Sequence, residues 1–146
     1  MRIYLDTCSL QRPLDDKSQK TIADEAQSVI RMLALCERGE ANLLSSEVLV
    51  FEKNLNRDLV RRRHTEECLK YATDFIELNA DIEKRAEVFV QNGITDLDAL
   101  HLASAEISEA DYFCTSDKKF YKKATWMRLA KMKIVMPTEL WEELKK

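Results

Sequence analysis

Two acidic residues lie at or just beyond the ends of short apolar runs. Asp6 comes after residues 2–5, and Asp117 comes after residues 112–115. Both runs are apolar, β-prone and short, which predicts buried strands. Ligands of an open parallel sheet collect outside the carboxyl ends of its strands. We therefore expect the carboxylates of Asp6 and Asp117 to share one edge of a sheet.

Two further acids are predicted to reach that edge. Glu52 and Asp98 lie near the starts of helices that follow strands or loops there. Two carboxylates about 4 Å apart repel by roughly 4 kcal/mol at an effective dielectric constant near 20. Four together therefore either take up protons or bind a cation, and ligands that are all oxygen select Mg²⁺ or Mn²⁺ over zinc. Such an ion orients water and stabilises charge on a phosphoryl oxygen, which is the chemistry of phosphodiester hydrolysis.

The spacing of apolar residues predicts the elements that position these acids. We expect strands at residues 2–5, 41–44, 112–115 and 133–136. We expect helices at residues 22–34, 47–59, 69–76, 82–90 and 95–105, and a terminal helix capped by Thr138. The third and fourth of these helices are expected to form a hairpin. Residues 7–16, which include Pro13, read as a loop. Short strands separated by helices predict an α/β fold with helices on both faces of a mainly parallel sheet.

Two local signals mark the ends of predicted helices. Gly39 follows the first helical pattern and is expected to stop it. The pair Ser45-Ser46 precedes the second pattern and offers an N-cap. These signals support the predicted helix boundaries.

Composition sets the class of protein. A chain of 146 residues with 45% hydrophobic content predicts one domain, residues 1–146, with a single core. The 34% charged fraction, with only two Gly and two Pro, argues against disorder and turn-dense all-β folds. No apolar run approaches the roughly 18 residues of a membrane span, and Asp6 interrupts any signal peptide, so we expect a cytoplasmic protein. The four cysteines form no C-x-x-C pair and are expected to be reduced packing residues.

Positive charge gathers late in the chain. The whole chain has a formal net charge of −3, yet residues 115–135 contain seven basic residues and one acid. Aromatic residues are interleaved with these bases, and this composition can follow a phosphate backbone and stack on bases. The alternative is a solvated helix face whose rings belong to the core. We expect a mixture, with most of the aromatic area buried. The candidate RNA contacts are Lys118, Lys119, Lys122 and Lys123.

Four segments, taken in order, resemble a known family. They are Asp6-Thr7-Cys8-Ser9, the segment from Ser46 to Glu52, the string DALHLASA at residues 98–105, and T-S-D-K-K-F at residues 115–120. Together they resemble the PIN domain family, and within it the VapC-type ribonucleases, over nearly the whole chain. The resemblance implies an α/β/α sandwich, a Mg²⁺ or Mn²⁺ site and endonuclease activity that selects single-stranded or structured RNA.

The resemblance also implies roles for individual residues. Asp6 matches the metal ligand after the first strand, and Glu52 matches the helix glutamate. Asp98 matches the acid that opens the DALH helix, and Asp117 matches the acid after the third motif strand. Thr115 matches the hydroxyl residue two positions before that acid.

Three positions leave the assignment open. Glu47 and Asp96 lie close to the motif acids and could replace or supplement them. Glu47 also fits a simple helix-dipole role in a first helical turn. Ser9 stands where the family commonly has a small or amide side chain. These three residues are therefore secondary candidates, together with Thr115.

Several candidates also have purely structural explanations. Asp6 could cap the turn that follows it, and Asp117 could form an Asx turn. Thr95 and Asp98 have the spacing of a capping box, in which the acid accepts from the cap amide. His101 falls in an apolar helix pattern without metal-ligand companions, so we expect a packed, hydrogen-bonded core histidine.

The combined prediction is a Mg²⁺- or Mn²⁺-dependent endoribonuclease. The resemblance to VapC toxins further implies an antitoxin partner and a homodimer. The alternative from another class is a catalytically silent PIN-like module that binds RNA or acts as a scaffold. An aspartyl-phosphate phosphatase is disfavoured because its chemistry needs a second acid two residues after Asp6, where this chain has Cys8.

Overall fold

Five short strands form one parallel sheet at the centre of the protein. The structure is a computed structural model, and it describes residues 1–146. The strands are β1 (Arg2–Leu5), β2 (Asn42–Ser46), β3 (Ala72–Ile76), β4 (Tyr112–Cys114) and β5 (Lys133–Val135). Their order across the sheet is β3-β2-β1-β4-β5, and every neighbouring pair is parallel. This sheet confirms the predicted mainly parallel α/β architecture.

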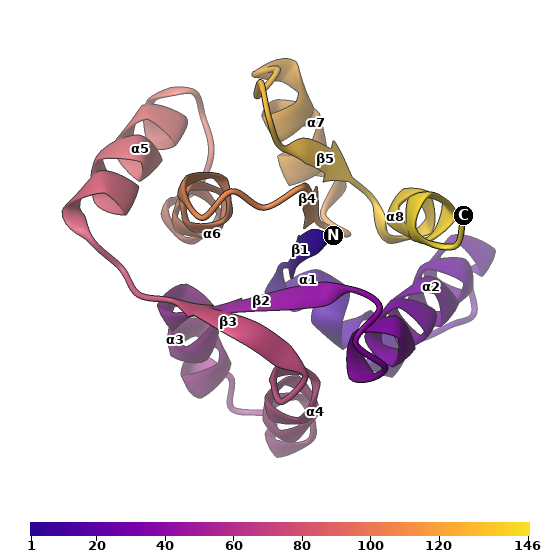
Figure 1. Cartoon of the computed structure of the whole chain (residues 1–146). Helices are drawn as coiled ribbons and strands as arrows, with labels where there is room; N and C mark the ends of the chain where they lie inside the picture. Colours follow the sequence, from indigo (N-terminus) through magenta and orange to yellow (C-terminus); the bar gives the residue numbers. More distant parts are fainter.

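Helices cover both faces of the sheet. They are α1 (Thr7–Gln11), α2 (Lys20–Glu37), α3 (Glu47–Leu55), α4 (Leu59–Leu69), α5 (Ala80–Gln91), α6 (Asp96–Ile107), α7 (Lys118–Trp126) and α8 (Pro137–Leu144), with a 3₁₀ turn η1 (Arg12–Leu14). Helices α2 and α8 lie side by side on one side of the sheet, and α5 and α6 form a pair on the other (Figure 1). The layers follow the helix–sheet–helix order of an α/β/α sandwich. None of the helices has the length and apolar character that a membrane crossing requires.

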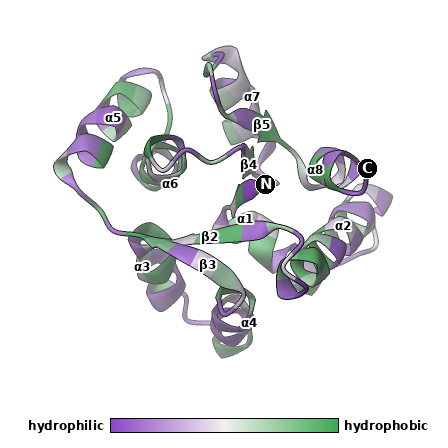
Figure 2. Cartoon of the chain, in the orientation of Figure 1, coloured by the Kyte–Doolittle hydropathy of each residue, from purple (hydrophilic) through white to green (hydrophobic).

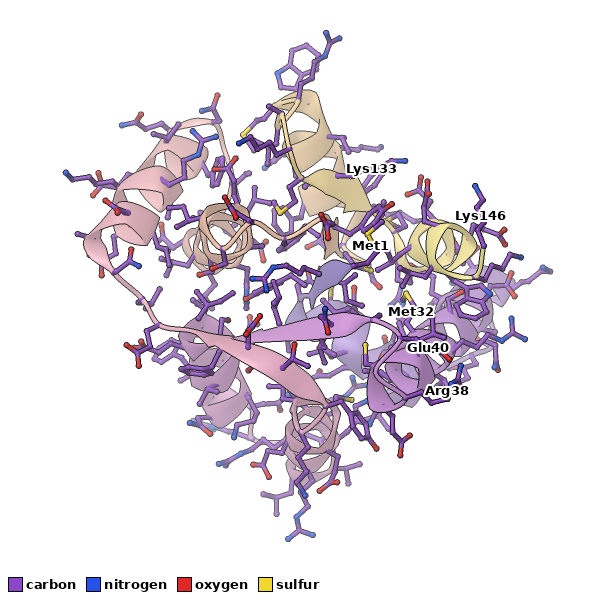
Figure 3. The ribbon with its side chains drawn as sticks, in the orientation of Figure 1. Met1, Met32, Arg38, Glu40, Lys133 and Lys146 are labelled. Atoms are coloured by element: carbon purple, nitrogen blue, oxygen red, sulfur yellow. The ribbon has the colours of Figure 1, made fainter.

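The register of β1 and β4 creates the edge where the acids gather. Leu5 pairs with Cys114, and the next amide, that of Asp6, donates to the Cys114 carbonyl at 3.1 Å. Both strands therefore end side by side. Figure 3 labels Met1 and Lys133 beside the amino ends of β1 and β5, which is the opposite edge.

One apolar core holds the layers together. A cluster of thirty buried residues spans the sheet and the inner helix faces, and much of β2 and β5 is green in Figure 2. Tyr4 of β1 stacks on Phe113 of β4 with ring centroids 5.3 Å apart, and Phe120 of α7 meets Phe113 edge-on at 5.4 Å. This aromatic row ties α7 to the two central strands.

Many predicted boundaries are confirmed. The strands and the helices expected at residues 22–34 and 95–105 lie where the sequence placed them, within a few residues. Gly39 ends α2 with a φ of 76°, which only glycine adopts without strain. Ser46 caps α3, and its Oγ accepts from the amide of Leu49 at 3.1 Å. All four cysteines are free thiols, and three of them are buried.

Two predicted helical stretches are wrong. The expected helix at residues 47–59 ends at Leu55, and a separate helix, α4, begins at Leu59 with Asp58 as its N-cap. The expected helix at residues 69–76 is instead the strand β3, so the predicted hairpin does not exist. The spacing of apolar residues there fits a helix, but pairing with β2 gives the segment backbone partners that no local pattern reveals.

Two further expectations are wrong at helix starts. Residues 7–16 contain α1 and η1 rather than only loop, because the Asp6 carboxylate caps a short helix. Thr138 does not cap α8, which begins one residue earlier at Pro137. The amide of Met136 instead donates to Glu139 Oε1 at 2.9 Å. Proline in the first turn needs no amide partner, and this favours the earlier start.

Candidate active site

Asp6 is a buried acid at the end of β1. It is 3% exposed and occupies the N-cap of α1, as the structural interpretation of the sequence predicted. Its Oδ1 accepts from the amide of Ser9 and from the Cys8 thiol, each at 3.1 Å. Burial raises the pKa of Asp6 even though the hydroxyl of Thr115 and these donors act against the rise. The carboxylate therefore pays an energetic penalty that a nearby cation would relieve.

Asp98 is the second acid of this region and lies in the first turn of α6. Burial raises the pKa of Asp98, and the negative charges of Asp6 and Asp117 raise it further. These charges come from segments that follow β1 and β4, so two acids distant in sequence act on Asp98. The predicted capping box is wrong, because Thr95 makes no side-chain bond to a helix amide and its Oγ1 donates to Asp98 Oδ2 at 3.0 Å.

Glu52 reaches the region from α3 and is held by two donors. Its Oε1 accepts from His101 Nε2 at 2.9 Å and from the hydroxyl of Thr7. Burial by itself raises the pKa of Glu52, but the hydrogen bonds from His101 and Thr7 outweigh burial, and the net shift is downward. Glu52 is therefore an ionised carboxylate with a fixed orientation.

His101 belongs to a buried chain of hydrogen bonds. It is 1% exposed, and its Nδ1 lies 2.6 Å from the hydroxyl of Tyr4, which in turn lies 2.7 Å from Ser46 Oγ. The prediction of a packed core histidine is confirmed. Sequence reasoning missed the contact of His101 with Glu52, and its only signal was the position of His101 three residues after Asp98 on the same helix.

Asp117 is the fourth acid of this region and lies between the end of β4 and the start of α7. It is the N-cap of α7, and its Oδ1 accepts from the amides of Lys119 at 3.0 Å and Phe120 at 3.2 Å. This is the capping geometry that the Asx-turn interpretation predicted. The other carboxylate oxygen of Asp117, Oδ2, has no hydrogen-bond donor from the protein, since both amides bind Oδ1.

Two buried hydroxyl residues form hydrogen bonds to the backbone at and after the end of β4. Thr115 is fully buried, and its Oγ1 accepts from the amide of Asp117 at 3.1 Å. Ser9 is also fully buried, and its Oγ donates to the carbonyl of Cys114 at 3.3 Å. In these positions Thr115 and Ser9 fix the backbone beneath the acids.

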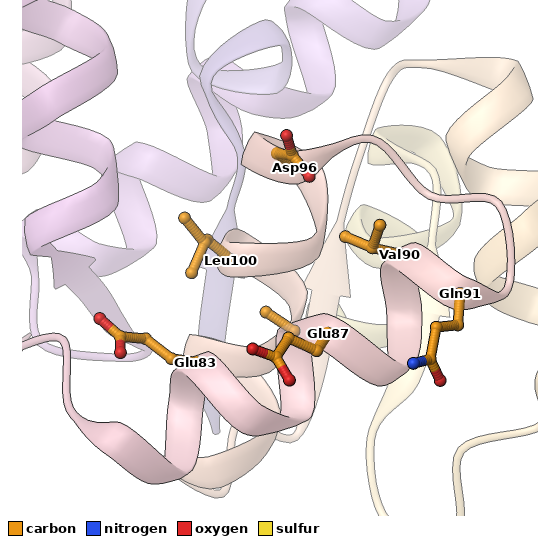
Figure 4. A pocket seen from close by; sticks show the side chains of 7 residues that line it. Glu83, Glu87, Val90, Gln91, Asp96 and Leu100 are labelled. Atoms are coloured by element: carbon orange, nitrogen blue, oxygen red, sulfur yellow. The ribbon is translucent and has the colours of Figure 1, made fainter.

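The two secondary acids lie elsewhere. Asp96 is exposed and lines a pocket of about 400 Å³ between α5 and α6, whose lining also includes Glu83 and Glu87 (Figure 4). Residues two apart on a helix lie about 200° apart around its axis, so Asp96 and Asp98 face different ways. Glu47 is exposed, and its Oε1 accepts from the amide of Leu78 at 3.0 Å. The structure brings neither side chain to Asp6.

A small pocket places cationic side chains beside the acids. It has a volume of about 120 Å³, and its lining includes Asp98, Asp117, Lys119 and Lys123. Lys123 Nζ donates to the carbonyl of Gly93 at 2.8 Å, which holds the lysine against the start of α6. The pocket therefore combines two carboxylates with two lysine side chains.

The donor set suits a hard divalent cation. As the side chains stand, no three His, Cys, Asp or Glu groups lie together at distances that would hold a metal ion, since each carboxylate is turned to a protein donor. Glu52, Asp98 and Asp117 each use only one carboxylate oxygen in this way. Their remaining oxygens, together with buried Asp6, form an all-oxygen set of the kind that Mg²⁺ and Mn²⁺ prefer.

Similar folds occur in solved structures at low sequence identity. The structure of VapBC2 from Rickettsia felis bound to a DNA fragment from its promoter has a TM-score of 0.60 and 14% identity, over 93% of this chain and 98% of that chain. PAE2754 from Pyrobaculum aerophilum has a TM-score of 0.60 and 17% identity, over 99% and 96%. VapC20 from Mycobacterium tuberculosis, a Sarcin-Ricin loop cleaving toxin, has a TM-score of 0.57 and 16% identity, over 82% and 93%.

The sequence itself gives the family. A search of curated proteins found no match. The PIN domain family matches residues 3–125, a range that contains Asp6, Glu52, Asp98 and Asp117. The match runs from the first strand into α7, and the fold agrees with it, so this protein belongs to the PIN domain family.

Proposed function

We propose that the protein is an endoribonuclease that uses Mg²⁺ or Mn²⁺ to hydrolyse phosphodiester bonds in RNA. The observation that carries the proposal is that Asp98 shares a pocket with Asp117 and that the charges of Asp6 and Asp117 raise the pKa of Asp98. A protein that keeps like charges together at a strand edge gains stability when a cation binds there. Membership of the PIN domain family supports a nuclease role for this site.

Each acid has a distinct place in the proposed reaction. Asp6, Glu52 and Asp98 would hold the metal ion, directly or through water. A bound divalent ion lowers the pKa of water and stabilises charge on a phosphoryl oxygen. Glu52 is held for this task by His101 and Thr7.

The remaining groups act on water and phosphate. Asp117 has a carboxylate oxygen free of protein donors, and this oxygen can accept a hydrogen bond from the attacking water or support a second ion. Lys119 and Lys123 line the same pocket, where their charges offset the negative charge of the phosphate group. RNA is therefore proposed to enter beside α7, with its phosphate over the acids.

The test is cleavage of RNA with Mn²⁺ by the native chain and by Asp6→Asn and Asp98→Asn. Both substitutions keep the size and hydrogen-bonding shape of the side chain while removing its charge. We expect each to lower the cleavage rate by roughly 100-fold or more, because a lost metal ligand removes several kcal/mol of charge stabilisation. Asp96→Asn is the matched control, and we expect it to cleave at the native rate.

Equal activity in the native chain, Asp6→Asn and Asp98→Asn would reject the enzyme. Retained RNA binding with no metal-dependent cleavage in any variant would instead favour a silent RNA-binding module. Loss of activity in Asp96→Asn alone would move the site to the pocket between α5 and α6.

We further propose that the protein is the cytoplasmic toxin of a toxin–antitoxin pair and forms a homodimer. The similar folds of VapBC2 and VapC20 support this biological setting. The genomic test is whether a short reading frame for a DNA-binding antitoxin lies immediately upstream. Expression of the chain alone should then arrest growth, and co-expression with that neighbour should restore growth. Sedimentation of the purified chain tests the dimer.

A further inference from the structure

Trp126 is the most exposed large apolar side chain of the protein. It is 83% exposed at the last position of α7, whereas Phe120 on the same helix is 3% exposed and belongs to the core. The expectation that most aromatic area in this segment is buried therefore fails at Trp126. An indole ring left in water costs free energy that burial against a partner would recover.

The helix connects this ring to the candidate active site. Asp117 caps the start of α7, and Trp126 stands at its end. Lys119, Lys123 and Trp126 are spaced four and three residues apart, which places them on one flank of the helix. Lys119 and Lys123 also line the pocket that contains Asp98 and Asp117. One continuous flank therefore runs from the acids, past two lysines, to the exposed ring.

The other two lysines of α7, Lys118 and Lys122, do not line this pocket. Both lysines are exposed. Relative to Lys119, Lys122 lies about 60° and Lys118 about 100° further round the helix, so Lys122, four residues before Trp126, lies beside the ring on the side away from the pocket. The sequence offered four lysines as candidate RNA contacts, and the fold brings two of them, Lys119 and Lys123, to the pocket with the acids.

We propose that Trp126 is a stacking platform for a base of single-stranded RNA, and that Lys119 and Lys123 hold the backbone between this base and the acids. The inference rests on the proposed function, since it places the same substrate on α7. The distance from residue 119 to residue 126 along the helix is about 10 Å, which suits a strand only a few nucleotides long. An indole face stacks on any base, and flanking lysines supply the phosphate contacts typical of single-strand sites.

Charge and geometry favour this occupant over a protein. Residues 115–135 carry seven basic residues and one acid, and that acid serves the helix cap. Trp126 ends a projecting helix (Figure 1), and of the lysine side chains on that helix only Lys123 has a hydrogen-bond partner, the carbonyl of Gly93, so this surface suits a polyanion with exposed bases. Duplex RNA keeps its bases stacked on one another, so it offers no free face to Trp126.

The experiment measures binding without cleavage. The chain has two tryptophans, so Trp141→Phe leaves Trp126 as the only indole fluorophore. In an Asp6→Asn, Trp141→Phe protein, we would titrate a single-stranded RNA oligonucleotide and a duplex of equal length in EDTA. We expect the single strand to quench Trp126 fluorescence and the duplex to leave it nearly unchanged. RNA fluorescence anisotropy gives the affinity independently.

Substitutions then separate stacking from charge. In Asp6→Asn protein, Trp126→Ala should weaken single-strand binding by roughly 5- to 100-fold, and Trp126→Phe should recover most of that loss. Phe75→Ala is the matched control, because Phe75 is 54% exposed on β3 at the far edge of the sheet. Replacing Lys119 and Lys123 by alanine should flatten the dependence of log affinity on log salt by roughly 1.4, more than the same change at Lys118 and Lys122.

Each outcome decides between the two proposals. Native affinity in Trp126→Ala, or RNA binding without any change in Trp126 fluorescence, overturns the platform while leaving a cleaving enzyme intact. Quenching without Mn²⁺-dependent cleavage by the otherwise native chain keeps the platform and rejects the nuclease. A fluorescence change that depends on protein concentration and not on RNA assigns Trp126 to an interface between copies of the chain and overturns the proposal.

Discussion

His101 Nε2 lies 2.9 Å from Glu52 Oε1, and the other nitrogen of the same ring faces the hydroxyl of Tyr4 at 2.6 Å. Ser46 Oγ accepts from the amide of Leu49 at 3.1 Å and lies 2.7 Å from the hydroxyl of Tyr4. Because an ionised carboxylate can only accept, the contact with Glu52 places a proton on Nε2 of His101. The buried chain thus fixes the orientation of a proposed metal ligand.

Two substitutions at His101 separate this role from simple packing. Glutamine carries its amide nitrogen about as far out as Nε2, whereas asparagine reaches only as far as Nδ1. We expect His101→Gln to keep Mn²⁺ affinity within a few-fold and His101→Asn to lose roughly 10- to 100-fold, the usual effect of removing a partner that orients a ligand. Titration calorimetry with Mn²⁺ measures this directly, with the melting temperature of each variant as the folding control. Equal affinities for the two variants would contradict the assigned role.

Asp6→Asn should stabilise the protein when no divalent ion is present. The side chain is buried, and burial raises the pKa of Asp6, so its charge opposes folding at neutral pH. Asparagine still accepts the cap bond from the amide of Ser9. In EDTA at pH 7 we expect a melting temperature a few degrees above that of the native chain, and Mn²⁺ should raise the native value only. Asp96→Asn should match the native chain, and a lower melting temperature for Asp6→Asn in EDTA would disprove this account.

The ion pair between Asp15 and Arg61 should make the free energy of unfolding depend on pH in the acidic range. Asp15 Oδ1 accepts from Arg61 Nη2 at 2.8 Å, and Arg12 donates to its other oxygen at 3.0 Å. Burial alone would raise the pKa of Asp15, but the two arginines lower it overall. Because the pKa of Asp15 is lower in the folded state than its ordinary value of 3.8, the ionised carboxylate stabilises the fold at pH values above 3.8. This contribution is lost as the pH falls through the folded-state pKa.

The check is urea unfolding of Asp15→Asn at several pH values. We expect a loss of about 1 kcal/mol at pH 7, because the pair is only partly buried. The difference from the native chain should shrink as the pH falls below 3.8. Asp16→Asn is the control, since Asp16 is exposed and its Oδ1 accepts from the amide of Ser18, a bond that asparagine can keep. A constant difference between Asp15→Asn and the native chain across this range would show that the ion pair is not its cause.

Ser104→Ala should increase stability. The hydroxyl of Ser104 is fully buried in α6 and has no hydrogen-bond partner. Removing an unsatisfied polar group and replacing it with the best helix former should add about 1 kcal/mol to the free energy of unfolding. Ser9→Ala provides the opposite case, because the hydroxyl of Ser9 donates to the carbonyl of Cys114. A decrease in the urea midpoint of Ser104→Ala would show that its hydroxyl has a partner after all.

Local sequence was sufficient for elements whose signals are short-range. The apolar run before Asp6, the glycine after α2 and the serine before α3 each act within one turn of the backbone, and each prediction is confirmed. The same logic was correct in placing Asp6 and Asp117 at the ends of strands. It failed at β3, because an edge strand is stabilised by pairing with β2, thirty residues away, and its own residues also fit a helix.

The amino-acid sequence by itself determined which acids were available and that two of them would lie at the carboxyl edge of one sheet. Only the tertiary structure decided how they act: the fold turned Asp98 toward Asp6 and Asp96 toward α5, joined Glu52 to His101, and left Trp126 in solvent. The physical reason is that burial, charge coupling and hydrogen bonding between distant segments depend on packing in three dimensions, which local spacing does not encode.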